Sequence, residues 1–293
     1  MFKRLEFYFV YLLLQLFRFM PFFLLYAISR FAFFLTYYIV GYRKKVVVTN
    51  LQNSFPEKSP EEIREISRKF FMNFCDVLAE TIKGSTMSED SLKKRFIAVN
   101  PELLDNLYDQ NRSVILVGAH YANSEWGKIL SRQQKHPIIV IYSPFMNKYV
   151  DRYYNRARIK FGMKLVNYEK TLRAFGEIRN GPHIFLMGVD QRPFDPRNAH
   201  WLTFLNQDTP CHKGYEQIAR KLNIPVVYSD IQRVKKGYYT IKYIMLCEEP
   251  AKTEEGFIVT RFMQTLEQIL HRKPEDWLWS HKRWKYRRPS ETN

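Results

Sequence analysis

The segment 113–126 constrains the fold more than any other part of the chain. It begins with the apolar, β-branched run 114–117, and a run this short predicts a buried strand. His120 stands where that strand should end, and we expect Asn123 or Ser124 to cap the helix that follows. In open α/β sheets, ligands bind at the edge formed by the carboxyl ends of the strands. His120 is therefore a candidate functional residue.

Glu125 would lie in the first turn of that helix, five positions after His120. The same spacing occurs between His271 and Asp276, in a charged stretch that proline interrupts and no strand precedes. Spacing alone is thus weak evidence for a site. A purely structural histidine remains the alternative for His120.

Apolar runs and helical patterns alternate along the rest of the chain. Strands are predicted at 137–142, 164–166, 183–189, 225–230 and 238–246. Helices are predicted at 57–83, 148–161, 171–179, 213–222 and 260–271, and a loop at 50–56. This alternation predicts an α/β fold with a mixed, mostly parallel sheet flanked by helices. The strand at 183–189 runs directly into Asp190 and Gln191, a second pair of polar residues at a strand end.

Residues 1–42 differ in composition from everything that follows. They concentrate the aromatic residues of the chain, and Arg18 and Arg30 divide them into apolar runs. Each run is about half of the ~20 residues that cross a bilayer. The segment predicts a membrane-anchoring helix pair broken near Pro21, or one tilted span, with a buried aromatic helix of a soluble core as the alternative. We divide the chain into this segment and one domain at 43–293.

The formal net charge of +17 favours anionic partners: phospholipid headgroups, nucleic acid or an acidic protein. The three cysteines show neither the spacing of a metal site nor that of a disulfide framework, which favours a cytosol-facing protein. No glycine-rich phosphate loop is present, so we expect no nucleotide cofactor. We also expect no metal, because His120, His183 and His212 lack the spacing of metal ligands. The basic, aromatic stretch 281–288 could bind nucleic acid, but a membrane surface suits it better, and a solvated tail is the plain alternative.

Several short motifs occur in a specific order. They are Asn-Leu-Gln-Asn-Ser-Phe-Pro-Glu at 50–57, His-x4-Glu at 120–125, Asn-Arg-Ala-Arg at 155–158, Gly-Val-Asp-Gln at 188–191 and Trp-Leu-Trp-Ser-His-Lys-Arg-Trp at 277–284. In this order the chain resembles the bacterial lipid A biosynthesis acyltransferases, the late lauroyl/myristoyl transferases of the lysophospholipid acyltransferase superfamily. It departs from their pattern at 204–212, where the family often has a glycine-rich turn. That departure leaves acyl-chain length and acceptor choice open.

The resemblance implies transfer of a fatty acyl group from an acyl carrier protein thioester to a hydroxyl of a membrane glycolipid. The expected acceptor is a lipid A precursor of lipopolysaccharide biosynthesis, at the cytoplasmic face of the bacterial inner membrane. A base must then take the hydroxyl proton, and a histidine that titrates near neutrality suits this role. His120 is the expected base. Glu125 would hold its imidazole in the required tautomer.

Four further residues are candidates on the substrate side. By resemblance, Arg158 would lie near the oxyanion or a substrate phosphate, and its helix neighbour Arg156 is the alternative. Asp190 and Gln191 would shape the acceptor side or support the arginine, or else only cap a strand end. None of these roles uses a cofactor.

Three other functions remain open at this stage. The same motifs could serve an acceptor such as a mannosylated phosphoinositide or an amino-acid lipid. The chain could instead be a catalytically inactive, membrane-tethered lipid-binding protein, although its complete set of polar motifs argues against this. A membrane-associated nucleic-acid binder is the third possibility, and we expect no nucleic acid among the partners.

Overall fold

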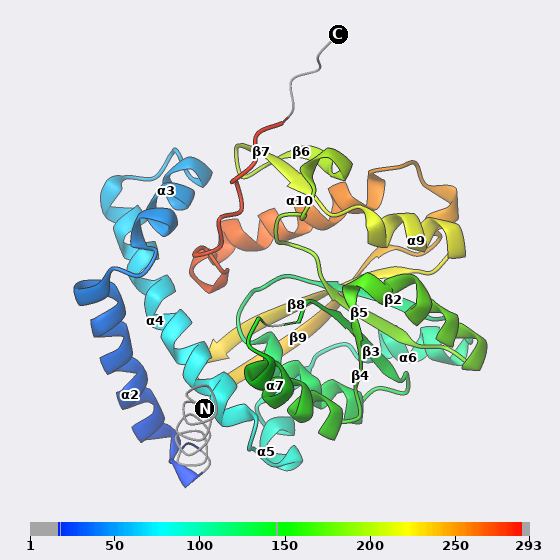
Figure 1. Cartoon of the computed structure of the whole chain (residues 1–293), viewed down its shortest axis with the longest axis horizontal. Helices are drawn as coiled ribbons and strands as arrows, with labels where there is room; N and C mark the ends of the chain where they lie inside the picture. The colour runs from blue at the N-terminus through cyan, green and yellow to red at the C-terminus, as the bar shows by residue number, and fades with distance from the viewer. Residues whose placement is uncertain (1–16, 18, 145, 289–293) are drawn as a thin grey trace.

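The computed structural model describes residues 17, 19–144 and 146–288 (Figure 1). Its main element is a seven-stranded sheet in the order β1-β9-β8-β2-β5-β3-β4. The strands are β1 Phe96–Ala98, β2 Val114–Gly118, β3 Ile138–Tyr142, β4 Lys164–Asn167, β5 Ile184–Gly188, β8 Val226–Lys235 and β9 Tyr238–Cys247. All neighbours pair in parallel except β8 and β9, which form an antiparallel hairpin. The predicted mixed, mostly parallel sheet is confirmed.

Helices cover both faces of this sheet (Figure 1). The α-helices are α2 Phe22–Phe34, α3 Lys44–Ser54, α4 Pro60–Gly84, α5 Glu89–Lys93, α6 Glu102–Asp109, α7 Lys148–Lys160, α8 Thr171–Ala174, α9 Gly214–Leu222 and α10 Phe257–Arg272. A π-helix, η1 Leu35–Val40, continues α2. The 3-10 helices are η2 Ser124–Arg132, η3 Tyr168–Lys170, η4 Phe175–Asn180, η5 Pro196–Asn198, η6 Pro250–Lys252 and η7 Pro274–Asp276.

The central strand β2 is buried on both faces of the sheet. Ile115 and Val117 pack into the cluster that contains α4, α9 and α10, whereas Val114 and Leu116 pack into the cluster that contains α6 and η2. Alternate side chains of a strand point to opposite faces, so an uninterrupted apolar run is what a strand between two helix layers requires. This burial explains why the run 114–117 marked the strand so clearly.

Helix α4 begins as its sequence predicts. The Ser59 hydroxyl accepts from the Glu62 backbone N, the Glu62 carboxylate accepts from the Ser59 N, and Pro60 occupies the first helical position. Apolar residues at helical spacing, Ile63 and Phe70 among them, are buried in the core. The helix therefore has one face in the core along most of its length.

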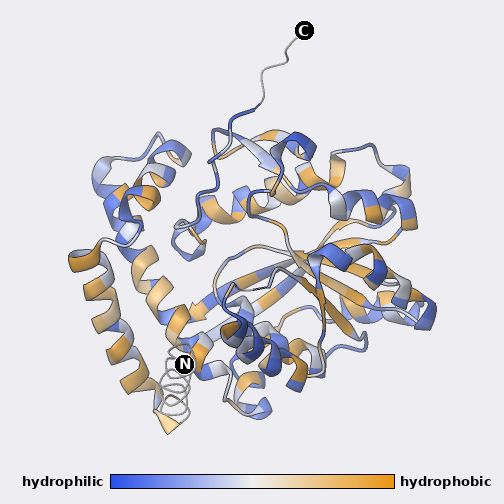
Figure 2. Ribbon diagram, viewed as in Figure 1, coloured by the Kyte–Doolittle hydropathy of each residue, from blue (hydrophilic) through white to orange (hydrophobic). Residues whose placement is uncertain are grey.

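The helix α2 packs lengthwise against α4 (Figure 1). Its buried residues Leu25, Ser29 and Phe33 recur every four positions, and Tyr37 of η1 continues this spacing. The opposite side is exposed and apolar, and Figure 2 shows α2 as a largely hydrophobic helix. Together, α2 and η1 form a 19-residue helix long and apolar enough to cross a membrane. The predicted break near Pro21 is confirmed, because α2 begins directly after this residue. The helix predicted before Pro21 lies mostly outside the described residues. The domain boundary at residue 42 stays a prediction.

The sequence missed two local structures. Residues 50–54, predicted as a loop, complete α3, and the Asn50 side chain in this last part of the helix donates to the backbone oxygens of Trp279 and His281. Residues His200–Phe204 and Gln207–Cys211 form a second, two-stranded sheet, β6-β7. Its turn residues Leu205 and Asn206 both have positive φ, as a tight hairpin requires, but leucine is not a residue that signals such a turn.

Other differences are smaller. Strand β1 and the short helices α5 and α6 were not predicted, and the helix expected at 171–179 is divided among α8 and η4. The strand expected at 225–230 extends as β8 to Lys235, because it pairs with β9 along its whole length. These are cases in which tertiary pairing decides where an element ends.

Candidate active site

The register of the sheet brings His120 and Asp190 together. Strands β2 and β5 pair in parallel with Gly118 opposite Gly188, and each of the two residues lies two positions beyond its glycine. A Cβ atom at Gly188 would lie 3.2 Å from Cε1 of His120, so the glycine leaves room for the imidazole over the strand. Two strand ends thus supply one polar pair at the carboxyl edge of the sheet.

The Asp190 carboxylate is buried and accepts three hydrogen bonds. Its Oδ1 lies 2.7 Å from Nδ1 of His120, and its Oδ2 accepts from the His120 backbone N at 2.9 Å and from Nε1 of Trp277 at 2.8 Å. The Asp190 side chain is 2% exposed, whereas that of His120 is 43% exposed. The acid is therefore fixed from within, and the ring remains accessible to a ligand.

The two pKa values follow from this contact. Burial raises the pKa of Asp190, but the His120 charge and the hydrogen bonds outweigh burial and bring that pKa to about 2. Burial lowers the pKa of His120, but the charge and hydrogen bond of Asp190, with a contribution from Glu125, raise it above its usual value. An ionised carboxylate can only accept hydrogen bonds, so Nδ1 carries a proton. In the neutral ring, Nε2 is then the basic atom.

Within the described part of the chain, Glu125 forms no hydrogen bond or ion pair with the imidazole, and Asp190 occupies the position at Nδ1 that was expected for Glu125. The Glu125 carboxylate instead pairs with Arg158 on α7, through Nε at 3.3 Å and through Nη2. The chain turns at Ala122, where φ is 53° and the backbone N donates to the oxygen of Asp276. Helix η2 then starts at 124, and Glu125 reaches across to α7.

The remaining predicted residues are not part of either pair. Arg156 is exposed on α7, two positions from Arg158 and therefore on a different side of the helix. Gln191 is half-buried after Asp190 and forms no hydrogen bond to the other predicted residues within the described part of the chain. The structure brings together His120 with Asp190 and Arg158 with Glu125.

A C-terminal segment, 273–278, holds the loop that follows His120. The His120 backbone oxygen accepts from Leu278 N at 3.1 Å, and Tyr121 forms an antiparallel bridge with Trp277. The Tyr121 hydroxyl donates to the backbone oxygen of Lys273. The tryptophan-rich motif was visible in the sequence, but nothing in the sequence assigned Trp277 to the Asp190 carboxylate.

Comparison with known proteins agrees with the motif order. The model of the family described as bacterial lipid A biosynthesis acyltransferase matches residues 1–286. The chain belongs to this family. It is similar to the lipid A biosynthesis palmitoleoyltransferase of Escherichia coli (strain K12), with 20% identity over 86% of this chain and 81% of the relative. The lauroyltransferase of the same organism is 23% identical over 84% and 80%, and a lipid A biosynthesis acyltransferase of Haemophilus influenzae is 21% identical over 79% and 72%.

A small hollow lies beside His120 in this lipid A biosynthesis acyltransferase. Helix α4 contributes Phe70, Asn73, Phe74 and Val77 to its wall, and 275–278 of the C-terminal segment also line it. The lining combines apolar side chains of α4 with the polar residues Asn73, Glu275 and Asp276. Beside a half-exposed imidazole, such a lining suits a ligand that is hydrocarbon in one part and polar at the reacting end. The geometry of the site is therefore compatible with the acyl-transfer chemistry of the family.

Proposed function

We propose that this enzyme transfers a fatty acyl group from an acyl carrier protein thioester to a hydroxyl of a lipid A precursor, with His120 as general base. One observation carries this proposal. The ionised Asp190 holds Nδ1 of His120, and the half-exposed ring is left with Nε2 as its basic atom. A base placed in this way contributes about 10²–10⁴-fold to a rate.

The proposed reaction needs no covalent intermediate on the protein. Nε2 of His120 takes the proton of the acceptor hydroxyl while the hydroxyl oxygen attacks the thioester carbonyl. The tetrahedral intermediate collapses, the new ester remains, and the carbon–sulfur bond breaks. The imidazolium then returns the proton to the leaving thiolate. Asp190 stabilises the imidazolium during this sequence, in the way that an aspartate supports the histidine of a serine triad.

The proposal gives Arg158 the task of stabilising negative charge on the substrate. A guanidinium has five N–H donors, of which two bond Glu125 and one approaches Asn155 Oδ1 at 3.5 Å. The remaining donors form no hydrogen bond to a described residue, and the proposal assigns them to an oxyanion or a phosphate. Glu125 would then be a positioning residue that holds the guanidinium, and a fixed donor of this kind is worth about 3–4 kcal/mol.

A basic stripe on α7 supports an acidic acyl donor. Lys148, Arg152, Arg156 and Lys160 are four residues apart, and all are exposed. Helix α7 also carries Arg158, so the stripe lies on an element of the site itself. Positive charge at this position would attract an acidic carrier protein and orient it toward the site.

The apolar side of α2 supports a location at the cytoplasmic face of the inner membrane. Phe23 and Phe31 of α2, and Ile39 and Val40 of η1, are each more than 60% exposed. Tyr42, which follows η1, stacks on Phe74 at 6.4 Å between ring centroids, and Phe74 lines the hollow beside His120. A lipid acceptor would therefore reach the site from the membrane side.

Mass spectrometry of lipids from cells with and without the gene tests the function. We expect lipid A to lose the mass of one fatty acyl group in the mutant, and to regain it with the wild-type gene but not with His120→Ala. Loss of an acyl group from another glycolipid or from an amino-acid lipid would discard the lipid A acceptor but keep the chemistry. Unchanged lipids, or full complementation by His120→Ala expressed at the wild-type level, would overturn the proposal.

A further inference from the structure

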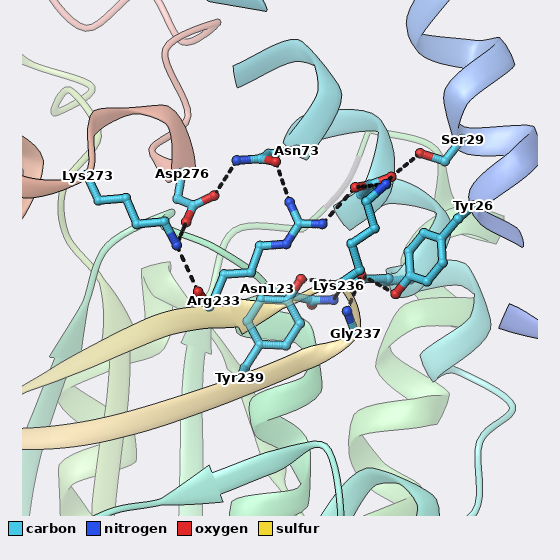
Figure 3. Close-up of polar contacts among 12 residues, drawn as sticks. Tyr26, Ser29, Asn73, Asn123, Arg233, Lys236, Gly237, Tyr239, Lys273 and Asp276 are labelled. Carbon is cyan, nitrogen blue, oxygen red and sulfur yellow. Dashed lines mark hydrogen bonds and ion pairs between the residues drawn. The ribbon is translucent and has the colours of Figure 1, made fainter. Parts of the chain in front are cut away.

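Glu80 on α4 is a fully buried acid that three distant segments contact. Its donors Tyr26, Asn123, Gly237 and Tyr239 are labelled in Figure 3. Its Oε1 accepts from the Tyr26 hydroxyl of α2 at 2.8 Å and from the Gly237 backbone N at 3.0 Å. Its Oε2 accepts from Nδ2 of Asn123 at 3.1 Å and from the Tyr239 hydroxyl. Four donors thus satisfy one carboxylate, and each donor group comes from outside α4.

One of these donors belongs to the loop between the two pairs of the site. Asn123 is buried and lies between His120 and Glu125 in the chain. Three residues later, Nε1 of Trp126 donates to the Glu80 backbone oxygen at 2.9 Å. The side chain and backbone of Glu80 therefore hold the chain on both sides of Glu125.

The helix α4 is built to receive that indole. A Cβ atom at Gly84 would lie 2.3 Å from Nε1 of Trp126, so a larger residue would displace the ring. Gly84 is four residues after Glu80 and lies one turn along the same face. The contact between the loop and α4 therefore depends on close approach as well as on hydrogen bonds.

The same face of α4 continues the network one turn earlier. Asp76 accepts from the Ser29 hydroxyl of α2 at 2.5 Å and from Nη2 of Arg233 at 2.7 Å. Asn73 donates to Oδ1 of Asp276 at 2.7 Å, and the Asp276 backbone oxygen holds the loop after His120. Figure 3 shows how Ser29 of α2, Arg233 of the β8-β9 hairpin and Asp276 of the C-terminal segment lie around Asn73 of α4.

We propose that Glu80 is a positioning residue through which the apolar helix α2 holds the loop 121–126 in its catalytic geometry. A buried carboxylate is tolerated only when its hydrogen-bond partners are all in place. Because α2 supplies one of four donors, the seating of α2 on the domain and the position of Asn123 depend on the same group. The membrane-facing helix is then part of the support of the active site as well as an anchor.

Two conservative variants of the full-length enzyme test this coupling, which rests on the proposed acyl transfer. Tyr26→Phe removes only the hydroxyl that α2 donates, and Glu80→Gln keeps the shape of the acceptor but removes its charge. Tyr38→Phe, on the exposed side of the same helical segment, is the matched control. Each protein is assayed for kcat and KM with an acyl carrier protein thioester and a lipid A precursor, for liposome flotation, and for amide hydrogen exchange in 121–126.

We expect Tyr26→Phe to lower kcat about 3–10-fold and Glu80→Gln about 10–100-fold, because small displacements of a catalytic loop reduce rates by such factors. The KM for the donor and the flotation of both variants should stay within about twofold of wild type, and exchange in the loop should accelerate. Tyr38→Phe should behave as wild type. In the double variant, the two losses should be less than multiplicative, because both remove the same interaction.

Wild-type kcat and loop exchange in Glu80→Gln would overturn the inference, as would multiplicative losses in the double variant. If Glu80→Gln does not fold, Tyr26→Phe alone decides, and unchanged loop exchange in that variant counts against the coupling. If the wild-type enzyme itself shows no acyl transfer, the proposed function fails. The exchange comparison would still test the structural coupling on its own.

Discussion

The two hydrogen-bonded pairs of the site, His120–Asp190 and Arg158–Glu125, differ in what holds them in place. The His120–Asp190 pair lies between the ends of adjacent strands, and its acid is 2% exposed. The Arg158–Glu125 pair joins helix α7 to helix η2, and its side chains are 15% and 27% exposed. The first pair is fixed by backbone register, whereas the second depends on the reach of two side chains. The rigid His120–Asp190 pair therefore suits the transfer of a proton at a fixed position. The Arg158–Glu125 pair suits a cation whose side chain adjusts to the substrate.

Asp190→Asn should produce the largest difference between the two pairs. An asparagine can keep the bonds to Trp277 and to the His120 backbone with its oxygen, but its amide then faces Nδ1 as a donor. The imidazole would be driven to the tautomer with a proton on Nε2, and kcat should fall by about 10²–10⁴-fold. Asp195→Asn, a partly exposed acid paired with Arg197, is the control and should leave kcat unchanged. A kcat near wild type for Asp190→Asn would remove Asp190 from the mechanism.

The same variant should shift the pH dependence of kcat/KM. The base must be neutral, so activity falls as the pH drops through the pKa of His120. Because Asp190 raises that pKa, the acid limb of the wild type should lie above pH 6.5, the usual value. Removing the charge leaves burial, which lowers the pKa, so the limb of Asp190→Asn should move to lower pH. A limb that stays in place would show that Asp190 does not tune the base.

The His120–Asp190 pair also shows which parts of the site could be predicted from the sequence. The runs before His120 and Asp190 predicted two buried strands with polar ends, and both strands are confirmed. The sequence could not show that these ends are neighbours, because register places Gly118 opposite Gly188 only in the folded sheet. Spacing suggested Glu125 as the partner of His120, but contacts across strands do not follow from distance along the chain.

The loop between the pairs gives a similar lesson. Asn123 was a candidate helix cap, and it does occupy the position before η2, but its side chain makes no capping bond. It bonds Glu80 instead, a residue 43 positions earlier. In the sequence, Glu80 is only one acid within the helix predicted at 57–83, since its four donors come from parts of the chain that the helical pattern does not connect. Buried polar residues with distant partners are therefore where local patterns fail.

Arg158→Lys should have an intermediate effect. A lysine keeps the charge but cannot form the two-pronged contact with Glu125 or present further fixed donors, so we expect kcat to fall about 10–100-fold. The matched control is Arg156→Lys, two residues earlier on the exposed side of α7, which keeps the basic stripe intact and should be neutral. Steady-state assays of both variants compare them directly. Equal losses in the two would show that position on the helix does not matter and that Arg158 has no special role.

The smallest effect should come from the stripe itself. Arg152→Glu reverses one exposed charge of the stripe, outside the His120–Asp190 and Arg158–Glu125 pairs. It should therefore raise the KM for the acyl carrier protein thioester about 3–10-fold at low salt and leave kcat unchanged. Because exposed charges are screened, the difference should shrink as salt increases. Lys221→Glu, an exposed residue of α9, makes the same charge change away from α7 and should leave KM unaltered.

A small thioester donor without the carrier protein separates docking from chemistry in this comparison. If the stripe acts only on the carrier, Arg152→Glu should use the small donor as well as the wild type does. A loss with both donors would mean that the charge acts on the site itself, through α7 and the Arg158–Glu125 pair. An unchanged KM for the carrier at low salt would remove the stripe from the docking surface. In that case the exposed basic side of α7 would have no role, and only the side that carries Arg158 would take part in the reaction.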